Sequence, residues 1–208
     1  LHALDAVSFH LTGPEQSLDL RVAIPGLYNA YNALAAASTA LAVGIAPHLI
    51  ADSLAGFRSA FGRIERLRYR DRDLVIVLVK NPVGFDEVLR MLATAGQNEP
   101  TMIVINDLDA DGRDVSWLWD VNVEQLASGC TALFTSGLRG PDMATRLKYA
   151  GVSTDRIHPL GQLNLALDEF VNAIPEGKTG YILPTYTAML ELRDILAHRG
   201  AVTSFWQQ

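Results

Sequence analysis

The sequence has little cysteine and no excess of positive charge. Cys130 is the one cysteine among 208 residues, so neither a disulfide nor a cysteine-based metal site can form within the chain. Because Cys130 lies in the apolar stretch CTALFT, we expect a buried thiol in a reducing cytoplasm. The 23 Asp and Glu residues outnumber the 17 Lys and Arg residues, which gives a net charge of −6. This balance argues against a nucleic-acid-binding protein, whose phosphate contacts require a basic surface.

We recognise neither a targeting signal nor a membrane-spanning segment in the sequence. The opening residues LHALDAVSFHL have neither the charged start nor the continuous apolar core of a signal peptide. The most apolar helical stretch, residues 33–46, is rich in alanine and too short to span a bilayer. We therefore predict a cytoplasmic protein that does not itself span a membrane.

Two catalytic patterns are missing as well. No G-x-x-x-x-G-K-[ST] loop occurs, which is the usual backbone cradle for nucleotide phosphates. None of the five histidines lies at a spacing from Cys, Ser or Asp that indicates a nucleophile–base pair. We therefore expect the chain to be inactive by itself.

The hydrophobic pattern changes near residue 61. Before this point, alternating stretches at 4–11 and 18–24 predict a hairpin, and helices are expected at 29–43 and 47–58. After it, a second hairpin precedes apolar runs that alternate with amphipathic helices, which is typical of a mostly parallel sheet with helices on both faces. The predicted strands are 64–70, 74–79, 101–106, 130–135, 155–159 and 179–183. The predicted helices are 84–95, 121–127, 141–150, 162–173 and 186–198.

This change divides the chain into residues 1–62, the edge of one domain, and residues 63–208, a complete α/β domain. In a parallel sheet, ligands bind outside the carboxyl ends of the strands. Polar clusters follow three strands of the second part: Lys80-Asn81, residues 106–114 and residues 184–187. We expect these loops to meet in a ligand site at one edge of the sheet.

Two asparagines and two cations are candidates for nucleotide contacts. Asn29 and Asn32 are three residues apart, so they share a helix face, and a carboxamide can pair with the edge of adenine. Asn29 could instead cap the helix, although capping does not account for Asn32. Arg63 and Lys80 flank the second hairpin and could hold phosphates. The alternatives are a solvated linker charge for Arg63 and a turn position for Lys80.

The stretch NDLDADGRDVSWLWD, residues 106–120, is rich in carboxylates and contains two tryptophans. Its start resembles a calcium-binding EF-hand loop, but Leu118 stands where a bidentate Glu is required. A carboxylate here could instead orient an imidazole, as in a catalytic triad. The remaining alternative is an acidic turn in which an Asp caps the next helix.

Two further patterns have both a structural and a ligand-binding interpretation. Arginines recur with period two in the second hairpin, at positions Arg66, Arg68, Arg70 and Arg72. This period predicts one strand face, which is either solvated or a surface for an anionic ligand or partner. At the start of the last helix, Thr185 or Thr187 is a suitable N-cap, and free N–H groups there could bind an anion.

Several of these motifs occur together in one known family. They are GLYNAYNALAA, FGRIE, LVKNPVGFDEVL, NDLDADGRDVSWLWDVNVEQL and LPTYTAML. With them the sequence resembles the MurT family, the Mur-ligase-like subunits of lipid II isoglutaminyl synthase. The resemblance extends from about residue 26 to residue 190. The acidic motif is highly specific, whereas the Asn-x-x-Asn and Gly-Arg elements are shared with Mur ligases generally.

The resemblance implies a fold and an activity. Residues 63–208 would form the Rossmann-like C-terminal domain of a Mur ligase, and residues 1–62 the end of its central domain. The enzyme would amidate D-glutamate in the stem peptide of membrane-anchored lipid II to D-isoglutamine. It would use ATP with magnesium, and ammonia that a separate GatD-like glutaminase subunit releases from glutamine. Zinc would be bound only by an upstream region that this sequence does not contain.

The resemblance also assigns roles to individual residues. Asn29 and Asn32 correspond to the adenine-side motif, and Arg63 and Lys80 to the phosphate-side positions. Asp114 lies where the family is expected to lend an aspartate to the Cys–His pair of the glutaminase.

Some alternatives stay open. Asp111 and Asp120 are neighbouring candidates for the role of Asp114. The chain could be a pure binding module for the glutaminase, or part of an amino-acid-adding Mur ligase. The GRDVSWLWD stretch argues against the last, because such ligases need no partner triad.

Overall fold

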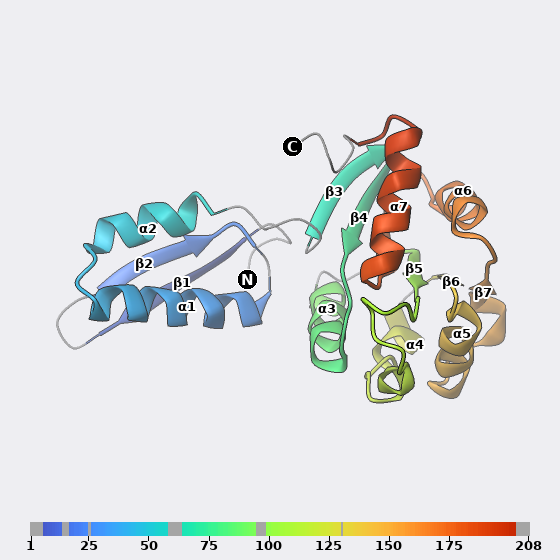
Figure 1. Cartoon of the computed structure of the whole chain (residues 1–208), viewed down its shortest axis with the longest axis horizontal. Helices are drawn as coiled ribbons and strands as arrows, with labels where there is room; N and C mark the ends of the chain where they lie inside the picture. The colour runs from blue at the N-terminus through green and yellow to red at the C-terminus, as the bar shows by residue number, and fades with distance from the viewer. Residues whose placement is uncertain are drawn as a thin grey trace. The chain divides into compact units, whose positions relative to one another are not determined.

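The computed structural model describes residues 6–13, 17–24, 26–57, 64–94, 99–129 and 131–202. The chain forms two compact units, Leu1–Ala60 and Phe61–Gln208 (Figure 1). Arg63 and Cys130 lie outside the described residues, so what was predicted for them stays a prediction. The assignment of residues 1–62 and 63–208 to parts of two Mur ligase domains also stays a prediction at this point.

The first unit is a two-stranded hairpin covered by two helices on one face. Strand β1 (Val7–Thr12) pairs antiparallel with β2 (Ser17–Val22), and the pairs Val7–Val22, Phe9–Leu20 and Leu11–Leu18 lie on the same face. Helices α1 (Leu27–Ala42) and α2 (Pro47–Ala55) pack against this face. The predicted hairpin and helices are therefore present, with shifted ends.

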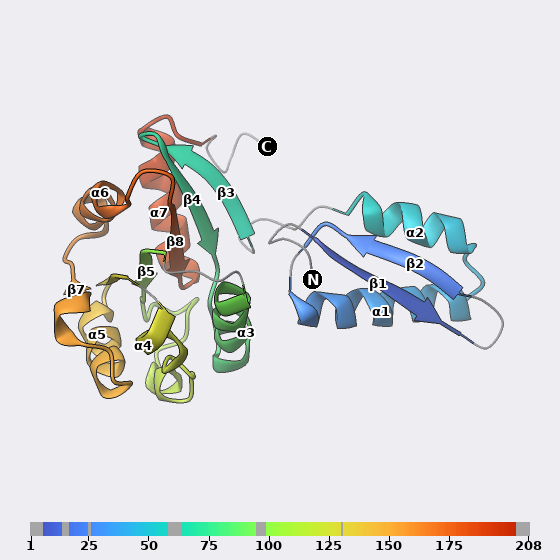
Figure 2. The ribbon, with the colours of Figure 1, turned by 180° about the vertical axis from the view of Figure 1, so that it is seen from behind.

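The second unit contains a six-stranded sheet in the order β3-β4-β8-β5-β6-β7. Strand β3 is antiparallel to β4, and all other neighbours are parallel. Figure 2 shows β8 between β4 and β5. The strands are β3 (Ile64–Tyr69), β4 (Arg72–Val77), β5 (Thr101–Val104), β6 (Leu133–Ser136), β7 (Ile157–Pro159) and β8 (Thr179–Pro184).

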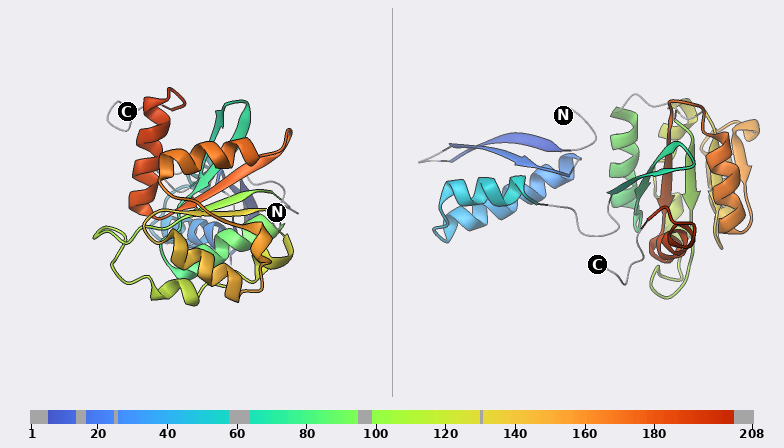
Figure 3. Two further views of the ribbon diagram at one scale, coloured as in Figure 1. Left: turned by 90° about the vertical axis from the view of Figure 1, so that its right-hand side faces the viewer. Right: turned by 90° about the horizontal axis from the view of Figure 1, so that it is seen from above.

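Helices cover both faces of this sheet (Figure 3). Helices α6 and α7 form one core cluster with the sheet, and α3, α4 and α5 lie on the other face. The helices are α3 (Pro82–Thr94), α4 (Gln125–Gly129), α5 (Gly140–Tyr149), α6 (Leu163–Ala173) and α7 (Tyr186–His198), with 3₁₀ helices η1 (Ser116–Trp119) and η2 (Thr154–Arg156). Because both faces are covered, the four consecutive residues 74–77 of β4 are all buried. The predicted fold class is confirmed.

The connections place a topological switch point between β5 and β8. The helices that follow β5 and β6 lie on one face, whereas α6 and α7, which precede and follow β8, lie on the other. The neighbouring strands β5 and β8 are thus followed by elements on opposite faces. In open α/β sheets, ligands bind in the crevice at such a point.

The second hairpin corrects one prediction about the arginines. Its turn consists of Arg70 and Asp71, with φ angles of 49° and 59°. Arg66 and Arg68 are exposed on β3, but Arg70 lies in the turn and Arg72 in β4. The four side chains therefore do not share one strand face, because the turn is formed by Arg70 and Asp71 and not by residues 71–73 as predicted.

The guanidinium groups of Arg70 and Arg72 have partners within the second unit. Arg70 forms an ion pair with Asp168 at 2.8 Å, and Nε of Arg72 donates to the carbonyl of Ile174 at 2.9 Å.

None of the helices within the described residues has the length and the apolar character that a membrane span requires.

Candidate functional site

Asn106 joins the ends of three parallel strands. It follows β5 and is buried. Its backbone N–H donates to Thr185 Oγ1 at 2.9 Å, and its Nδ2 donates to Thr187 Oγ1 at 3.2 Å, both beyond the end of β8. Its Oδ1 accepts the N–H of Leu138, beyond β6, at 3.0 Å. The predicted meeting of loops 106–114 and 184–187 at one edge of the sheet is therefore confirmed.

Asp111 connects the loop after β5 to the first turn of α7. We call residues 106–120 the acidic loop. Asp111 Oδ1 accepts the N–H of Thr187 at 2.9 Å, and Oδ2 accepts the Thr187 hydroxyl at 2.5 Å. Thr185 is the N-cap residue, as predicted, but its side chain makes no cap hydrogen bond, and its hydroxyl accepts the Asn106 N–H instead. The helix α7 is instead capped by a carboxylate from a distant loop. The negative charge of this carboxylate is stabilised by the positive end of the helix dipole.

Two other carboxylates of the acidic loop are bound by arginines. Arg139, just beyond β6, donates through Nε and a terminal nitrogen to Asp107 Oδ2 at 2.8 and 2.7 Å. This hydrogen bonding and charge raise the pKa of Arg139. Asp109 accepts from Arg113 at 2.8 Å within the loop. Asp107, Asp109 and Asp111 thus point to different partners, and the described residues contain no group of three His, Cys, Asp or Glu placed to hold a metal ion.

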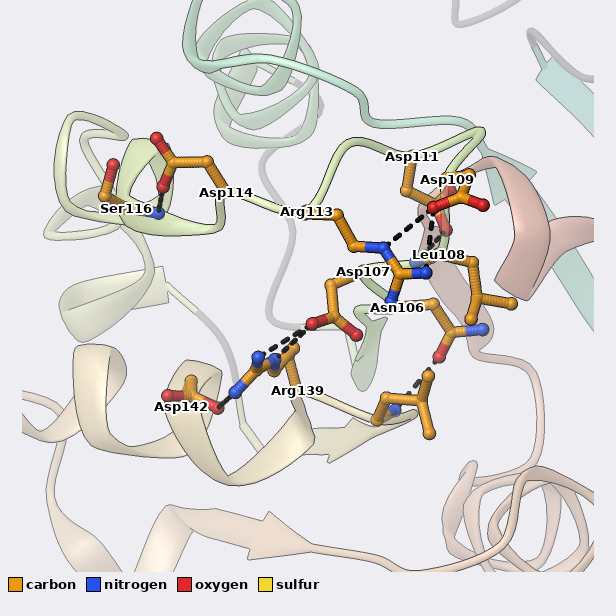
Figure 4. A network of polar contacts seen from close by, with 11 residues as sticks. Asn106, Asp107, Leu108, Asp109, Asp111, Arg113, Asp114, Ser116, Arg139 and Asp142 are labelled. Atoms are coloured by element: carbon orange, nitrogen blue, oxygen red, sulfur yellow. Dashed lines mark hydrogen bonds and ion pairs between the residues drawn. The ribbon is translucent and has the colours of Figure 1, made fainter.

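Asp114 lies exposed in the acidic loop. Its Oδ1 accepts the N–H of Ser116 at 2.8 Å, at the start of η1. Hydrogen bonds from the side chain and backbone of Ser116 lower the pKa of Asp114, so the carboxylate is ionised at neutral pH. Figure 4 shows it turned toward Ser116 and away from the Asp107–Arg139 pair. The contact is the local capping turn that the sequence offered as an alternative, and it leaves the carboxylate accessible.

The side chain of Arg146, in α5, binds the second half of the acidic loop. The residue is buried, and it donates to the carbonyls of Leu118 at 3.2 Å and Val121 at 2.7 Å. It also donates to Glu124 at 2.8 Å, and its guanidinium lies 5.6 Å from the ring of Trp119. Sequence reasoning missed Arg146, because an arginine on an amphipathic helix gives no signal of a buried partner.

One of the two tryptophans in the loop is exposed. Trp119 is 54% exposed, and its ring lies 5.8 Å from that of Tyr149, which is 73% exposed. Trp117 is half-buried and meets Phe85 edge-on at 6.4 Å. The acidic loop and the end of α5 therefore form an exposed aromatic pair.

The candidate nucleotide residues are divided between the two units. Helix α1 begins at Leu27, so the capping role for Asn29 is wrong, and Asn29 is buried at 4% exposure. Asn32, one turn later, is exposed and fits a contact with an adenine edge. Lys80 is exposed after β4, at the predicted ligand edge, and fits a phosphate contact. Asn81 Oδ1 accepts the N–H of Gly84 at 2.8 Å and caps α3.

Comparisons with known proteins give relatives and a fold. The chain is 37% identical over 182 residues to the subunit MurT of lipid II isoglutaminyl synthase (glutamine-hydrolyzing) from Streptococcus pneumoniae, covering 87% of this chain and 40% of that protein. It is 30% identical over 154 residues to the same subunit from Staphylococcus aureus strain COL, covering 73% and 35%. The chain thus spans two fifths or less of the length of these curated relatives. Among solved structures, MurF from Acinetobacter baumannii has a TM-score of 0.68 at 20% identity, covering 93% of this chain and 42% of that one, which shows a shared fold.

The family match falls on the α/β unit that contains the acidic loop. Residues 78–189, more than half of the chain, match the family described as MurT ligase C-terminal. This range begins directly after β4 and ends in the first turns of α7, so it includes every contact of Asn106 and Asp111 described above. The chain therefore belongs to the MurT ligase C-terminal family.

Proposed function

We propose that this chain is the C-terminal part of the ligase subunit of a glutamine-hydrolysing lipid II isoglutaminyl synthase. In the cytoplasm, the full-length subunit amidates the D-glutamate of the lipid II stem peptide to D-isoglutamine. A GatD-like glutaminase partner supplies the ammonia. The observation that carries the proposal is the acidic loop, which is held at the switch point of the sheet and exposes Asp114. The membership of the chain in the MurT family supports it.

Asp114 completes the active site of the partner. An ionised carboxylate can accept a hydrogen bond from an imidazole, set its tautomer and stabilise the imidazolium that forms when a cysteine is deprotonated. Asp114 is charged at neutral pH, as an aspartate with an ordinary or a lowered pKa is, and its exposure leaves it within reach of another protein. Asp111 is less suited, because both of its oxygens already accept hydrogen bonds from Thr187. Asp120 is exposed and is the remaining alternative.

The nucleotide is bound by the full-length protein, and four residues of this chain are the candidates to take part. Asn32 contacts the adenine edge, and Lys80 and Arg63 contact phosphates. Asn29, which is buried, is kept in the proposal as the second adenine-side residue. ATP with magnesium supplies the activation of the substrate carboxyl group.

The test uses the full-length subunit purified with its glutaminase. Asp114→Asn keeps the shape and removes the charge, so glutamine hydrolysis should fall about 10²–10⁴-fold by analogy with other triads. Complex formation, measured by co-purification, should survive. Asp120→Asn is the matched control, since it makes the same change at another exposed residue of the loop.

Each other outcome points to a different role. Full glutaminase activity in Asp114→Asn refutes the assignment, and loss only in Asp120→Asn moves the role to Asp120. Loss of co-purification in Asp114→Asn makes the loop a docking element. Glutamine hydrolysis without amidation of lipid II supports a pure binding module, and transfer of a free amino acid supports an amino-acid-adding ligase.

A further inference from the structure

We propose that Asp111 and Thr187 are positioning residues for the glutaminase partner, because they tie the acidic loop to α7 and thereby set the place of Asp114. This inference rests on the proposed function of Asp114. It assigns to these two residues a positioning task that is separate from proton transfer.

The tie is made of several hydrogen bonds to one carboxylate. Both oxygens of Asp111 are used, Oδ1 by the Thr187 N–H at 2.9 Å and Oδ2 by the Thr187 hydroxyl at 2.5 Å. Oδ2 also accepts the N–H of Leu108 at 3.3 Å, which closes the turn within the loop. The negative charge lies at the N-terminus of a 13-residue helix, where the helix dipole stabilises it.

The Thr187 hydroxyl links the tie to the body of the unit. It donates to Asp111 and accepts from Nδ2 of buried Asn106 at 3.2 Å. The amide oxygen of Asn106 in turn accepts the N–H of Leu138 at 3.0 Å. Hydrogen bonds thus run from Leu138, beyond β6, through Asn106 and Thr187 to Asp111. A valine at position 187 would fill the same space without either bond.

Asp114 depends on such anchors, because its own contact stays inside the loop. Its carboxylate accepts from Ser116, two residues away. Gly112, with a φ of 94°, redirects the chain between Asp111 and Asp114. The loop is fixed to the body before this point by Asp111 and after it by Arg146, which binds the carbonyl of Leu118. Asn106 and Asp107 hold the start of the loop, and Asp111 is the anchor nearest to Asp114 on its upstream side.

A loose anchor should lower catalysis by displacing Asp114. A misplacement of about 1 Å at a catalytic group can reduce a rate about 100-fold. We therefore expect Asp111→Asn and Thr187→Val to lower the turnover number for glutamine about 10- to 100-fold in the intact complex. Thr187→Ser retains the hydroxyl and should retain most of the activity. The double variant should be no slower than the slower single variant, since both break one tie.

The experiment measures loop order and catalysis on the same full-length complexes. Hydrogen exchange of backbone amides in residues 108–117 reports the tie directly. The pH profile of kcat/KM reports Asp114, because removing its charge lowers the pKa of the partner imidazole and moves the acid limb to lower pH. Asp109→Asn is the matched control, since Asp109 lies in the same loop but contacts only the exposed Arg113 among the contacts described above.

The inference requires faster loop exchange, lower turnover and a shifted acid limb in Asp111→Asn and Thr187→Val, with none of these in Asp109→Asn. Unchanged loop exchange in Asp111→Asn overturns it. Faster exchange with full turnover, beside an inactive Asp114→Asn, also overturns it while the proposed function stands. Full activity in Asp114→Asn removes the proposed function, and the positioning role with it.

Discussion

Gly137 lies in a place that has no room for a side chain. Its φ is 87°, and an added Cβ would lie 2.5 Å from the carbonyl oxygen of Ile105 and 2.8 Å from Asn106 Oδ1. Gly137→Ala should therefore destabilise the unit by at least about 1–3 kcal/mol, through backbone strain and overpacking. Unfolding in urea measures the change. Gly151→Ala is the control, because Gly151 has a φ of 86° with open space around it, so it reports the backbone strain alone. Equal losses in both variants would contradict the close approach to Asn106.

The carboxyl group of Asp114 should titrate below its ordinary range. The side chain of Ser116 makes the largest contribution to the lowered pKa, followed by its backbone N–H. Since the pKa is lowered on folding, the stabilising contact is present above the unfolded pKa and is lost as the pH falls through the folded pKa. NMR titration of the Asp114 carboxyl carbon checks this, and Ser116→Ala should raise the pKa toward its ordinary value. An identical titration curve in that variant would show that the Ser116 hydroxyl makes no contact.

At the scale of elements, α5 supports the acidic loop through one side chain. Arg146→Met leaves two loop carbonyls, of Leu118 and Val121, without their charged donor. We expect a loss of about 2–3 kcal/mol in the free energy of unfolding, because hydrogen bonds to charged groups are among the stronger ones. Glu124→Gln should cost only about 0–1 kcal/mol, since that side chain is 52% exposed and its ion pair is screened by solvent. Chemical denaturation compares the two variants, and a larger loss from Glu124→Gln would reverse the assignment of the support to the carbonyl contacts.

Elements with a strong local pattern could be predicted from the sequence. Helix α7 was predicted at 186–198 and occupies those residues, because its buried positions recur with helical period. Helix α4 was predicted at 121–127 but lies at Gln125–Gly129. The N–H of Asn122 instead bonds Asp86 of α3 at 2.8 Å. The conformation of this segment thus depends on a hydrogen-bond partner 36 residues away, about which local periodicity carries no information.

The site could be located from the sequence but not assembled from it. The carboxyl ends of parallel strands lie at the same edge of a sheet, which was enough to predict that residues 106–114 and 184–187 meet. The structure shows the hydrogen bonds between them. The arginines that hold the loop, Arg139 and Arg146, were not found, because their partners depend on how α5 packs. Thr185 looked like a cap by position, yet the cap is Asp111, 76 residues from Thr187. Contacts of this range follow from tertiary packing, which single residues do not reveal.

At the scale of the whole molecule, the isolated chain should not hydrolyse ATP. Its candidate nucleotide residues are divided between two units, and the P-loop pattern that supplies most phosphate contacts is missing from the sequence. A phosphate-release assay on the purified chain should equal the buffer background. The chain with Lys80→Ala is the control for contaminating ATPases, because a contaminant is indifferent to this change. Turnover that persists through further purification and falls in Lys80→Ala would contradict the prediction.

The position of β8 has a consequence for how the protein is made. This strand lies between β4 and β5, although it comes after both of them and after β6 and β7 in the chain. During synthesis, β4 and β5 must therefore wait with unpaired edges until residues 179–184 have left the ribosome. Thr187 follows three residues after the end of β8, so the Asp111–Thr187 contact of the acidic loop can form only after β8 has been made. A nascent chain that stalls before β8 therefore cannot fix the acidic loop to α7.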